Sequence, residues 1–281
     1  MIKPNEVVKT ITPKSLTVIK GHVFKKIVLL CRLMARYVLR IAYKGTNYHG
    51  WQSQLTGTTV QEVLEAELSK VLRTKTPVMG CGRTDAGVHA TNFILHFTYE
   101  SELPDRFLFR LNRMLPADIA VYEAFEVTDQ FHARFSATYR KYIYKTTLVK
   151  NPFEENETVF LFQEPDLAKM NAGCEVLLKH TDFASFCKRG ADNKTTLCDL
   201  MLAQWVVNGD NLEFHVQANR FLRNMVRALV GTLLEVGYGK IDLEQLEEII
   251  QDKSRSSSGK SVAAKGLYLS EIGYNWNEYR K

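Results

Sequence analysis

The 281-residue sequence has no long hydrophobic run. Its best apolar stretch, IVLLC at 27–31, ends at Arg32 and is far shorter than the roughly 20 residues that cross a bilayer. No small-residue cleavage site follows this stretch, so a secretory signal is not expected. We therefore predict a protein without a membrane span, located in the cytoplasm.

Cysteine is scarce, and the usual metal and phosphate motifs are missing. The five cysteines are odd in number and no pair has CxxC spacing, which argues against a disulfide framework or a structural zinc site. The histidines lack HExxH spacing, GxGxxG is absent, and SSSGKS at 256–261 lacks the first glycine of a phosphate loop. The sequence predicts buried, reduced thiols and no metal.

The formal net charge of +6 comes wholly from the first 35 residues, which hold seven basic residues and one acid. The remaining residues are formally neutral, so the basic balance alone does not indicate a nucleic-acid partner. Residues 1–35 are interpreted as a basic N-terminal extension: a disordered arm, a weak RNA-binding tail, or residues upstream of a start near Met34. We expect residues 1–33 to be dispensable for activity.

Hydrophobic periodicity predicts an α+β fold, with two similar halves sharing a largely antiparallel sheet that carries helices on one face. The halves are expected at 36–136 and 137–281, and a mobile loop at 254–261. A turn at Asn208-Gly209 predicts a hairpin between the strands LMLAQWVV and LEFHVQA. Other strands are expected at 37–43, 92–99, 119–127 and 139–149, and helices at 59–73, 105–115, 166–180, 221–237 and 242–250.

The stretch GRTDAGVHA at 82–90 places Asp85 and Arg83 between two glycines that permit a sharp bend. In one interpretation, Asp85 only caps local amide groups in a surface turn. In the other, the bend presents the carboxylate in a cleft. Arg83 and His89 favour the second, because both could meet an anionic ligand.

Two further segments are basic and lack acids. FHARFSATYRKYIYK at 131–145 interleaves aromatic residues with Arg134, Arg140 and Lys141, and no acid lies between Asp129 and Glu154. Such a segment could neutralise phosphates and stack on unpaired bases, or simply form a strand with a wet basic face; both readings have about equal weight.

The segment ANRFLRNMVR carries Arg220, Arg223 and Arg227 at helical spacing, with no acid between Glu213 and Glu235. A solvated helix face is the default interpretation of such a stripe. Alternatively, the arginines meet phosphate or an acid from elsewhere in the fold, such as Asp85.

Taken together, GRTDAGVHA, FHARFSATYRKYIY, NRFLRNMVR and GLYL resemble the tRNA pseudouridine synthase A family, in the same order, over residues 36–274. YKGTNYHGWQSQ at 43–54 and LNRMLPADIAV at 111–121 are similar to that family too. The resemblance implies the pseudouridine synthase fold with ferredoxin-like or RRM-like halves, and a homodimer without cofactor or metal. It also implies isomerisation of uridines 38, 39 and 40 in the anticodon stem-loop of tRNA.

The resemblance also implies roles for single residues. Asp85 matches the catalytic aspartate and Arg227 the arginine that pairs with it. Tyr142 matches a tyrosine that stacks on the target base and takes a proton, and Leu267 an apolar residue of the pocket. Arg83 is expected to hold the displaced nucleotide. RNA contacts are expected from Arg134, Arg140, Lys141, Arg220 and Arg223.

Two alternatives stay open. A non-catalytic tRNA-binding module or chaperone would use the aromatic and basic segment equally well, but it leaves Asp85 unexplained, because an unpaired carboxylate repels phosphate. A glycosidase-type hydrolase needs a second acid near Asp85, and the local sequence offers none. Cys81, and the lack of a Gly-Gln pair within 91–97, depart from the usual family pattern.

Overall fold

The computed structural model describes residues 34–188, 190 and 194–281. The predictions for residues 1–33 lie outside the described residues. Residues 35–281 form one compact unit. Within the described part of the chain, every helix is too short or too polar to span a membrane.

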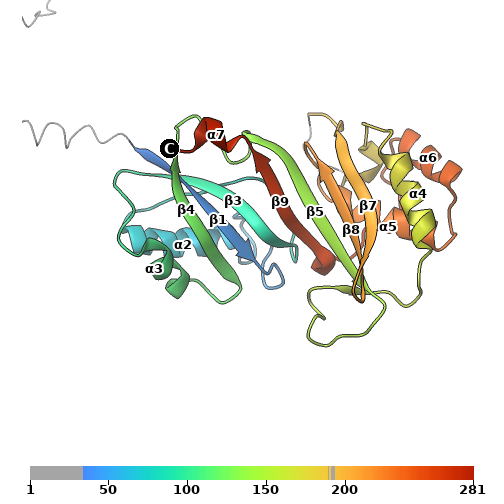
Figure 1. The fold of residues 1–281 in the computed structure, drawn as a ribbon, viewed down its shortest axis with the longest axis horizontal. Helices are drawn as coiled ribbons and strands as arrows, with labels where there is room; N and C mark the ends of the chain where they lie inside the picture. The colour runs from blue at the N-terminus through green and yellow to red at the C-terminus, as the bar shows by residue number, and fades with distance from the viewer. Residues whose placement is uncertain (1–33, 189, 191–193) are drawn as a thin grey trace, which may run out of the picture. The chain divides into compact units, whose positions relative to one another are not determined.

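One nine-stranded sheet runs through the unit in the order β4-β1-β3-β9-β5-β8-β7, with β2 beside β3 and β6 beside β5 (Figure 1). The pairs are antiparallel except β3–β9 and β5–β6, which are parallel. The strands are β1 (Ala35–Tyr43), β2 (Met79–Gly80), β3 (His89–Tyr99), β4 (Ile119–Val127), β5 (Ala137–Thr147), β6 (Val159–Phe160), β7 (Leu200–Asn208), β8 (Asn211–Ala218) and β9 (Leu267–Tyr274).

The helices divide between the two ends of this sheet. Two of them lie beside β1, β3 and β4, and three lie beside β7 and β8 (Figure 1). The first group is α2 (Val60–Leu72) and α3 (Phe107–Met114); the second is α4 (Leu167–Leu177), α5 (Met225–Gly237) and α6 (Leu243–Gln251); and α7 (Trp276–Tyr279) follows β9. This mixed, mostly antiparallel sheet with its helices confirms the predicted α+β class and is consistent with the pseudouridine synthase fold.

The buried apolar side chains form two clusters, one containing residues of α2 and α3 and the other residues of α4, α5 and α6. Tyr142 on β5 packs against both clusters, and β9 contributes residues to both. The middle strands therefore join the two ends of the sheet. The proposed boundary between residues 136 and 137 stays a prediction.

The helix predicted at 221–237 begins later than expected. Asn224 has a left-handed backbone with φ of 65°, and α5 starts at Met225. A helix cannot pass through such a residue, because its repeating hydrogen bonds need right-handed dihedrals. Arg220 and Arg223 consequently lie in the loop before α5, and only Arg227 is on the helix. The predicted single stripe of three arginines on one helix is wrong.

The segment 254–261 is a loop, as predicted, but it is closely packed. Ser258 and Gly259 are buried, and the Ser258 hydroxyl donates to the Ser185 carbonyl oxygen at 2.6 Å. The Gly259 amide donates to the hydroxyl of Thr232 on α5 at 3.0 Å. The small, polar side chains that suggested mobility instead allow the backbone to lie close to α5.

Candidate active site

The loop at 81–88, between β2 and β3, is fixed at Thr84. The Thr84 hydroxyl is hydrogen-bonded to the hydroxyl of Tyr43 at 2.9 Å, and its carbonyl oxygen accepts from the Trp51 amide at 3.3 Å. Thr84 is buried, whereas the next residue, Asp85, is half-buried. The buried neighbour thus anchors the backbone while the carboxylate remains reachable from solvent.

Glycines let a second segment approach this loop closely. A Cβ added to Gly50 would lie 2.3 Å from the Thr84 carbonyl oxygen, and Gly50 itself has φ of +87°. Gly87 also has a positive φ, and its amide donates to the Tyr48 carbonyl oxygen at 3.2 Å. Residues 48–51, in the segment between β1 and α2, therefore hold the bend of GRTDAGVHA in place by hydrogen bonds and close backbone packing.

His89, the first residue of β3, makes hydrogen bonds at the other end of the same loop. Its Nδ1 accepts from the Gly45 amide at 3.1 Å and its Nε2 lies 3.0 Å from the Lys265 carbonyl oxygen. The ring stacks on Tyr268 at 4.6 Å. Burial lowers the pKa of His89, and these contacts select the neutral tautomer with a proton on Nε2. The expectation that His89 meets an anionic ligand is wrong, because both ring nitrogens have partners.

The sheet topology brings the predicted site residues together. The start of β3 pairs in parallel with the start of β9, with His89 opposite Tyr268. On the other side of β9, Leu269 is opposite Tyr142 of β5. The loop carrying Asp85 precedes β3, and Leu267 begins β9. Segments that are far apart in the sequence therefore converge at the middle of the sheet.

Arg227 of α5 points its guanidinium at Asp85. The distance from Arg227 Nη1 to Asp85 Oδ2 is 3.7 Å, and Arg227 Nε donates to the Val262 carbonyl oxygen at 2.7 Å. The exposed fractions of the two side chains are 21% for Arg227 and 34% for Asp85. A carboxylate of this kind carries a paired charge and can still be reached by a substrate.

Tyr142 lies close enough to Asp85 for the carboxylate to influence its ionisation. Burial raises the pKa of Tyr142 well above its ordinary value; Cys81 and the Asp85 carboxylate act in the same direction, and the Arg140 guanidinium acts against them. The ring packs edge-on against Phe221 at 5.1 Å. At neutral pH the phenol is protonated, which suits stacking and hydrogen-bond donation and disfavours the expected role in taking a proton.

The other two residues expected in the pocket differ in exposure. Leu267 is buried and pairs with Tyr144 across the sheet. Arg83 is exposed, and its side chain makes no hydrogen bond or ion pair with a described residue. Arg83 is thus available to a ligand, whereas Leu267 belongs to the buried apolar cluster that also contains Val88 and Tyr144.

Arg140 makes four hydrogen bonds to backbone carbonyl oxygens. Nη1 donates to Ala137 and Asn219, and Nη2 donates to Cys81 and Arg134, at 2.6 to 3.3 Å. These bonds connect the loop before Asp85 with the basic segment and the loop before α5. A contact between Arg140 and RNA, as predicted, would compete with these four hydrogen bonds for the same guanidinium.

Of the other predicted RNA-binding residues, two are exposed and two are half-buried. Arg134 is exposed and lies over the ring of Phe135 at 5.6 Å, and Lys141 is half-buried. Arg220 donates to the Thr195 carbonyl oxygen at 3.3 Å, while Arg223 is exposed with no side-chain bond to a described residue. Arg134 and Arg223 are the members of this set best placed to meet phosphates.

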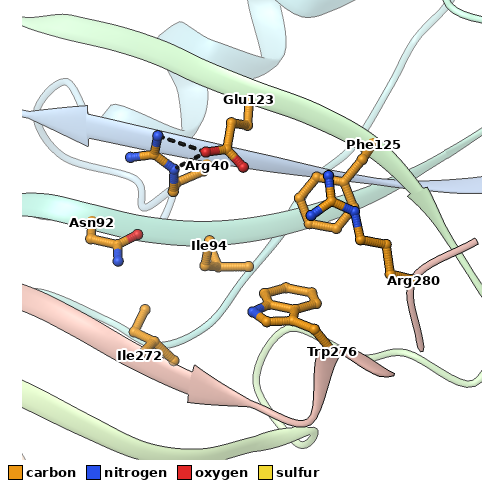
Figure 2. A pocket seen from close by; sticks show the side chains of 8 residues that line it. All are labelled: Arg40, Asn92, Ile94, Glu123, Phe125, Ile272, Trp276 and Arg280. Atoms are coloured by element: carbon orange, nitrogen blue, oxygen red, sulfur yellow. Dashed lines mark hydrogen bonds and ion pairs between the residues drawn. The ribbon is translucent and has the colours of Figure 1, made fainter. Parts of the chain in front are cut away.

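A small hollow of about 120 Å³ lies elsewhere, among side chains of β1, β3, β4, β9 and the chain end. Figure 2 shows the Arg40–Glu123 ion pair at one side and Trp276 and Arg280 at the other, with Asn92 on β3. None of the predicted site residues lines it. Within the described part of the chain, no cluster of three or more His, Cys, Asp or Glu side chains could hold a metal ion.

A profile described as tRNA pseudouridine synthase matches residues 40–136 and 177–275. The chain belongs to the tRNA pseudouridine synthase family. Curated relatives named tRNA pseudouridine synthase A include those of Parabacteroides distasonis, 44% identical over 86% of this chain and 96% of the relative, and Bacteroides fragilis, 45% identical over 85% and 96%. The relative from Bacteroides thetaiotaomicron is 43% identical over 86% and 91%.

Membership in the tRNA pseudouridine synthase family identifies an isomerase that acts on tRNA and confirms the resemblance found in the sequence motifs. The matched segments include Asp85, Arg83, Arg227 and Leu267. Tyr142 falls between the two segments, as do Arg140 and Lys141. The case for Tyr142 therefore depends on the motif resemblance and on its electrostatic interaction with Asp85.

The residues that orient Arg227 were not predicted from the sequence. The Val262 carbonyl oxygen accepts from Arg227, and the neighbouring Ser261 hydroxyl accepts from Asn224 at 2.5 Å. Backbone carbonyls carry no sequence signal, and a serine-rich run indicates only a loop. The glycine within SSSGKS is the one hint that this loop lies close to another backbone.

Proposed function

We propose that this tRNA pseudouridine synthase uses Asp85 as its catalytic group and acts on uridines 38, 39 and 40 of the anticodon stem-loop. The observation that carries the proposal is the Asp85–Arg227 pair, with Nη1 and Oδ2 3.7 Å apart and the carboxylate one-third exposed. The resemblance of the motifs supplies the nucleotide positions.

The reaction is an isomerisation that needs no redox partner. The C1′–N1 bond of uridine breaks, the base turns, and C5 forms a new bond to C1′; N1 gains a proton and C5 loses one. An ionised aspartate can attack the sugar or the base, or remove a proton from the ribose. The Arg227 guanidinium lies opposite the carboxylate and can pair with its negative charge.

The target base has to leave its stack in the RNA, which costs a few kcal/mol. Tyr142, half-buried and within electrostatic reach of Asp85, offers a ring on which the extruded uracil can stack, and Leu267 provides an apolar floor. Exposed Arg83 is free to occupy the gap that the nucleotide leaves. Together these side chains offset part of the cost of extrusion.

Beyond the site, Arg134, Lys141, Arg220 and Arg223 are proposed to contact phosphates of tRNA, with Arg140 ordering the loops that carry them. The family resemblance supports a homodimer. Because the substrate is tRNA, we also propose that the protein acts in the cytoplasm. No cofactor or metal is invoked.

Replacing Asp85 with Asn tests the catalytic role. D85N is expected to fold and bind tRNA but to release no tritium from tRNA that contains 5-tritiated uridine. The exposed Asp105, replaced with Asn, is the control and should leave release unchanged. Normal release by D85N would overturn the catalytic assignment. An enzyme-dependent map of pseudouridine outside positions 38–40 would overturn the substrate assignment.

A further inference from the structure

Residues 255–262, here called the strap, lie between α6 and β9 and run along α5. A Cβ added to Gly231 of α5 would lie 2.0 Å from the Lys260 carbonyl oxygen. The Gly259 amide donates to Thr232 of α5 at 3.0 Å. The backbones thus pass so closely that no side chain fits between them, and the position of the strap is coupled to that of the helix.

Arg255 organises the strap from within. Its Nη1 donates to the Ser258 hydroxyl at 2.8 Å and to the Gly259 carbonyl oxygen at 3.2 Å, and its Nη2 donates to the Ser261 hydroxyl at 2.8 Å. Among the described residues, Arg255 has no ion-pair partner. Its charge is therefore used in hydrogen bonds to neutral oxygens of the strap, and such charge-assisted bonds are stronger than neutral ones.

The far end of the strap holds the first turn of α5. The Ser261 hydroxyl that accepts from Arg255 also accepts from Asn224, the residue just before the helix. The Val262 amide donates to the Arg227 carbonyl oxygen at 3.2 Å, and the Val262 carbonyl oxygen accepts from Arg227 Nε at 2.7 Å. Both the backbone and the guanidinium of Arg227 are thus oriented by the strap.

We propose that Arg255 is a positioning residue for pseudouridine formation: by ordering the strap, it aims Arg227 at the catalytic carboxylate. The inference rests on the proposed role of Asp85. Arg255 does not touch the substrate in this scheme. Its effect follows because a displacement of about 1 Å in a group near the reacting atoms can cost on the order of 100-fold in rate.

The first test separates chemistry from binding. R255M should lower single-turnover tritium release from tRNA by about 10- to 100-fold, while the Kd for tRNA changes by less than about threefold. K260M is the matched control: it removes one positive charge from the exposed part of the strap, and the Lys260 side chain makes no bond to a described residue. Normal release by R255M, or an equal rate loss in K260M, would overturn the proposal.

The second test asks whether Arg255 acts through Arg227. Adding R255M to R227K should cost little beyond R227K alone, because the group that the strap aims has already been changed. Multiplicative losses in the double variant would contradict this route. If R255M fails to fold, R255K is measured in the same cycle, since lysine keeps the charge but cannot bridge the serine and glycine oxygens.

Amide hydrogen exchange provides a readout that does not depend on activity. R255M should accelerate exchange of the Val262 amide, which donates to Arg227, while K260M should not. Unchanged protection at Val262 would overturn the proposal. Comparison with D85N keeps the two hypotheses apart: an active D85N refutes the catalytic role of Asp85, whereas an inactive D85N beside a fully active R255M refutes only the positioning role of Arg255.

Discussion

Two arginines of the site, Arg140 and Arg223, illustrate how differently the same residue type is used. Arg140 donates to four backbone carbonyl oxygens, and Arg223 is exposed without a side-chain partner among the described residues. Burying an unpaired carbonyl costs about 1–3 kcal/mol, whereas an exposed side chain can be changed within about 0.5 kcal/mol. The first residue is expected to matter for stability and the second for binding.

We therefore predict that R140M lowers the free energy of unfolding by about 2 kcal/mol or more, because it leaves several carbonyl groups without a donor. R223M should leave unfolding unchanged but weaken tRNA binding and reduce the slope of log Kd against log salt by about 1. Urea denaturation and filter binding at several salt concentrations measure the two effects. A stable R140M with a reduced salt slope would instead favour the original prediction that Arg140 contacts phosphate.

At the scale of single residues, part of the site could be predicted from the sequence. The lack of acids between Glu213 and Glu235 made Asp85 a reasonable partner for Arg227, and the structure brings the two together. The environment of His89 was not visible, because its partners are the backbone groups of Gly45 and Lys265. Side-chain patterns indicate which groups need partners, but they do not identify a distant carbonyl or amide.

Among the helices and strands, α2 is the element whose first residue the sequence indicates most clearly. Thr59 caps the helix: its hydroxyl accepts from the Glu62 amide at 3.3 Å, and the Glu62 carboxylate accepts from the Thr59 amide at 3.2 Å. The sequence predicts a helix from residue 59, where Thr59 and Glu62 have the spacing of a capping box, and the structure confirms this start. Because all members of the capping box are within three residues, tertiary contacts were not needed to recognise it.

The cap provides a local stability prediction. T59A should lower the free energy of unfolding by about 1 kcal/mol, since it leaves the Glu62 amide without its partner. T59S, which keeps the hydroxyl, is the matched control and should recover most of the loss. Urea denaturation of both variants measures the difference. Equal stabilities of T59A and the unaltered protein would show that the cap contributes nothing measurable.

Strand β9 shows why other elements could not be predicted. Leu267, Tyr268 and Leu269 are all buried, because β9 lies in the middle of the sheet between β3 and β5. A strand covered on both faces loses the alternation of polar and apolar residues that marks a half-exposed strand. The late start of α5 has another cause: the left-handed turn at Asn224 is supported by the Ser261 hydroxyl, which is far away in the sequence.

At the scale of the whole molecule, three buried or half-buried histidines are expected to make the stability of the fold sensitive to acid. They are His89, His96 and His132. Burial, together with the smaller effects of the neighbouring His132 and Arg36, lowers the pKa of His96 to about 4. Burial is also the largest cause of the lowered pKa values of His89 and His132. His96 Nδ1 accepts from the Ala133 amide at 3.1 Å, so protonation there would remove the acceptor of a buried bond.

The unfolded chain therefore binds more protons than the folded protein between the ordinary histidine pKa of about 6.5 and the lowered values, and acid favours unfolding. Stability should be fully present above about pH 7 and fall as the pH drops toward 4, with each such histidine contributing up to about 1.4 kcal/mol per pH unit. Urea denaturation at pH 8, 7, 6 and 5 measures the slope. H96Q, which keeps an uncharged acceptor, should flatten the curve below pH 6.5. The same slope in H96Q and the unaltered protein would show that His96 is not responsible for the acid sensitivity.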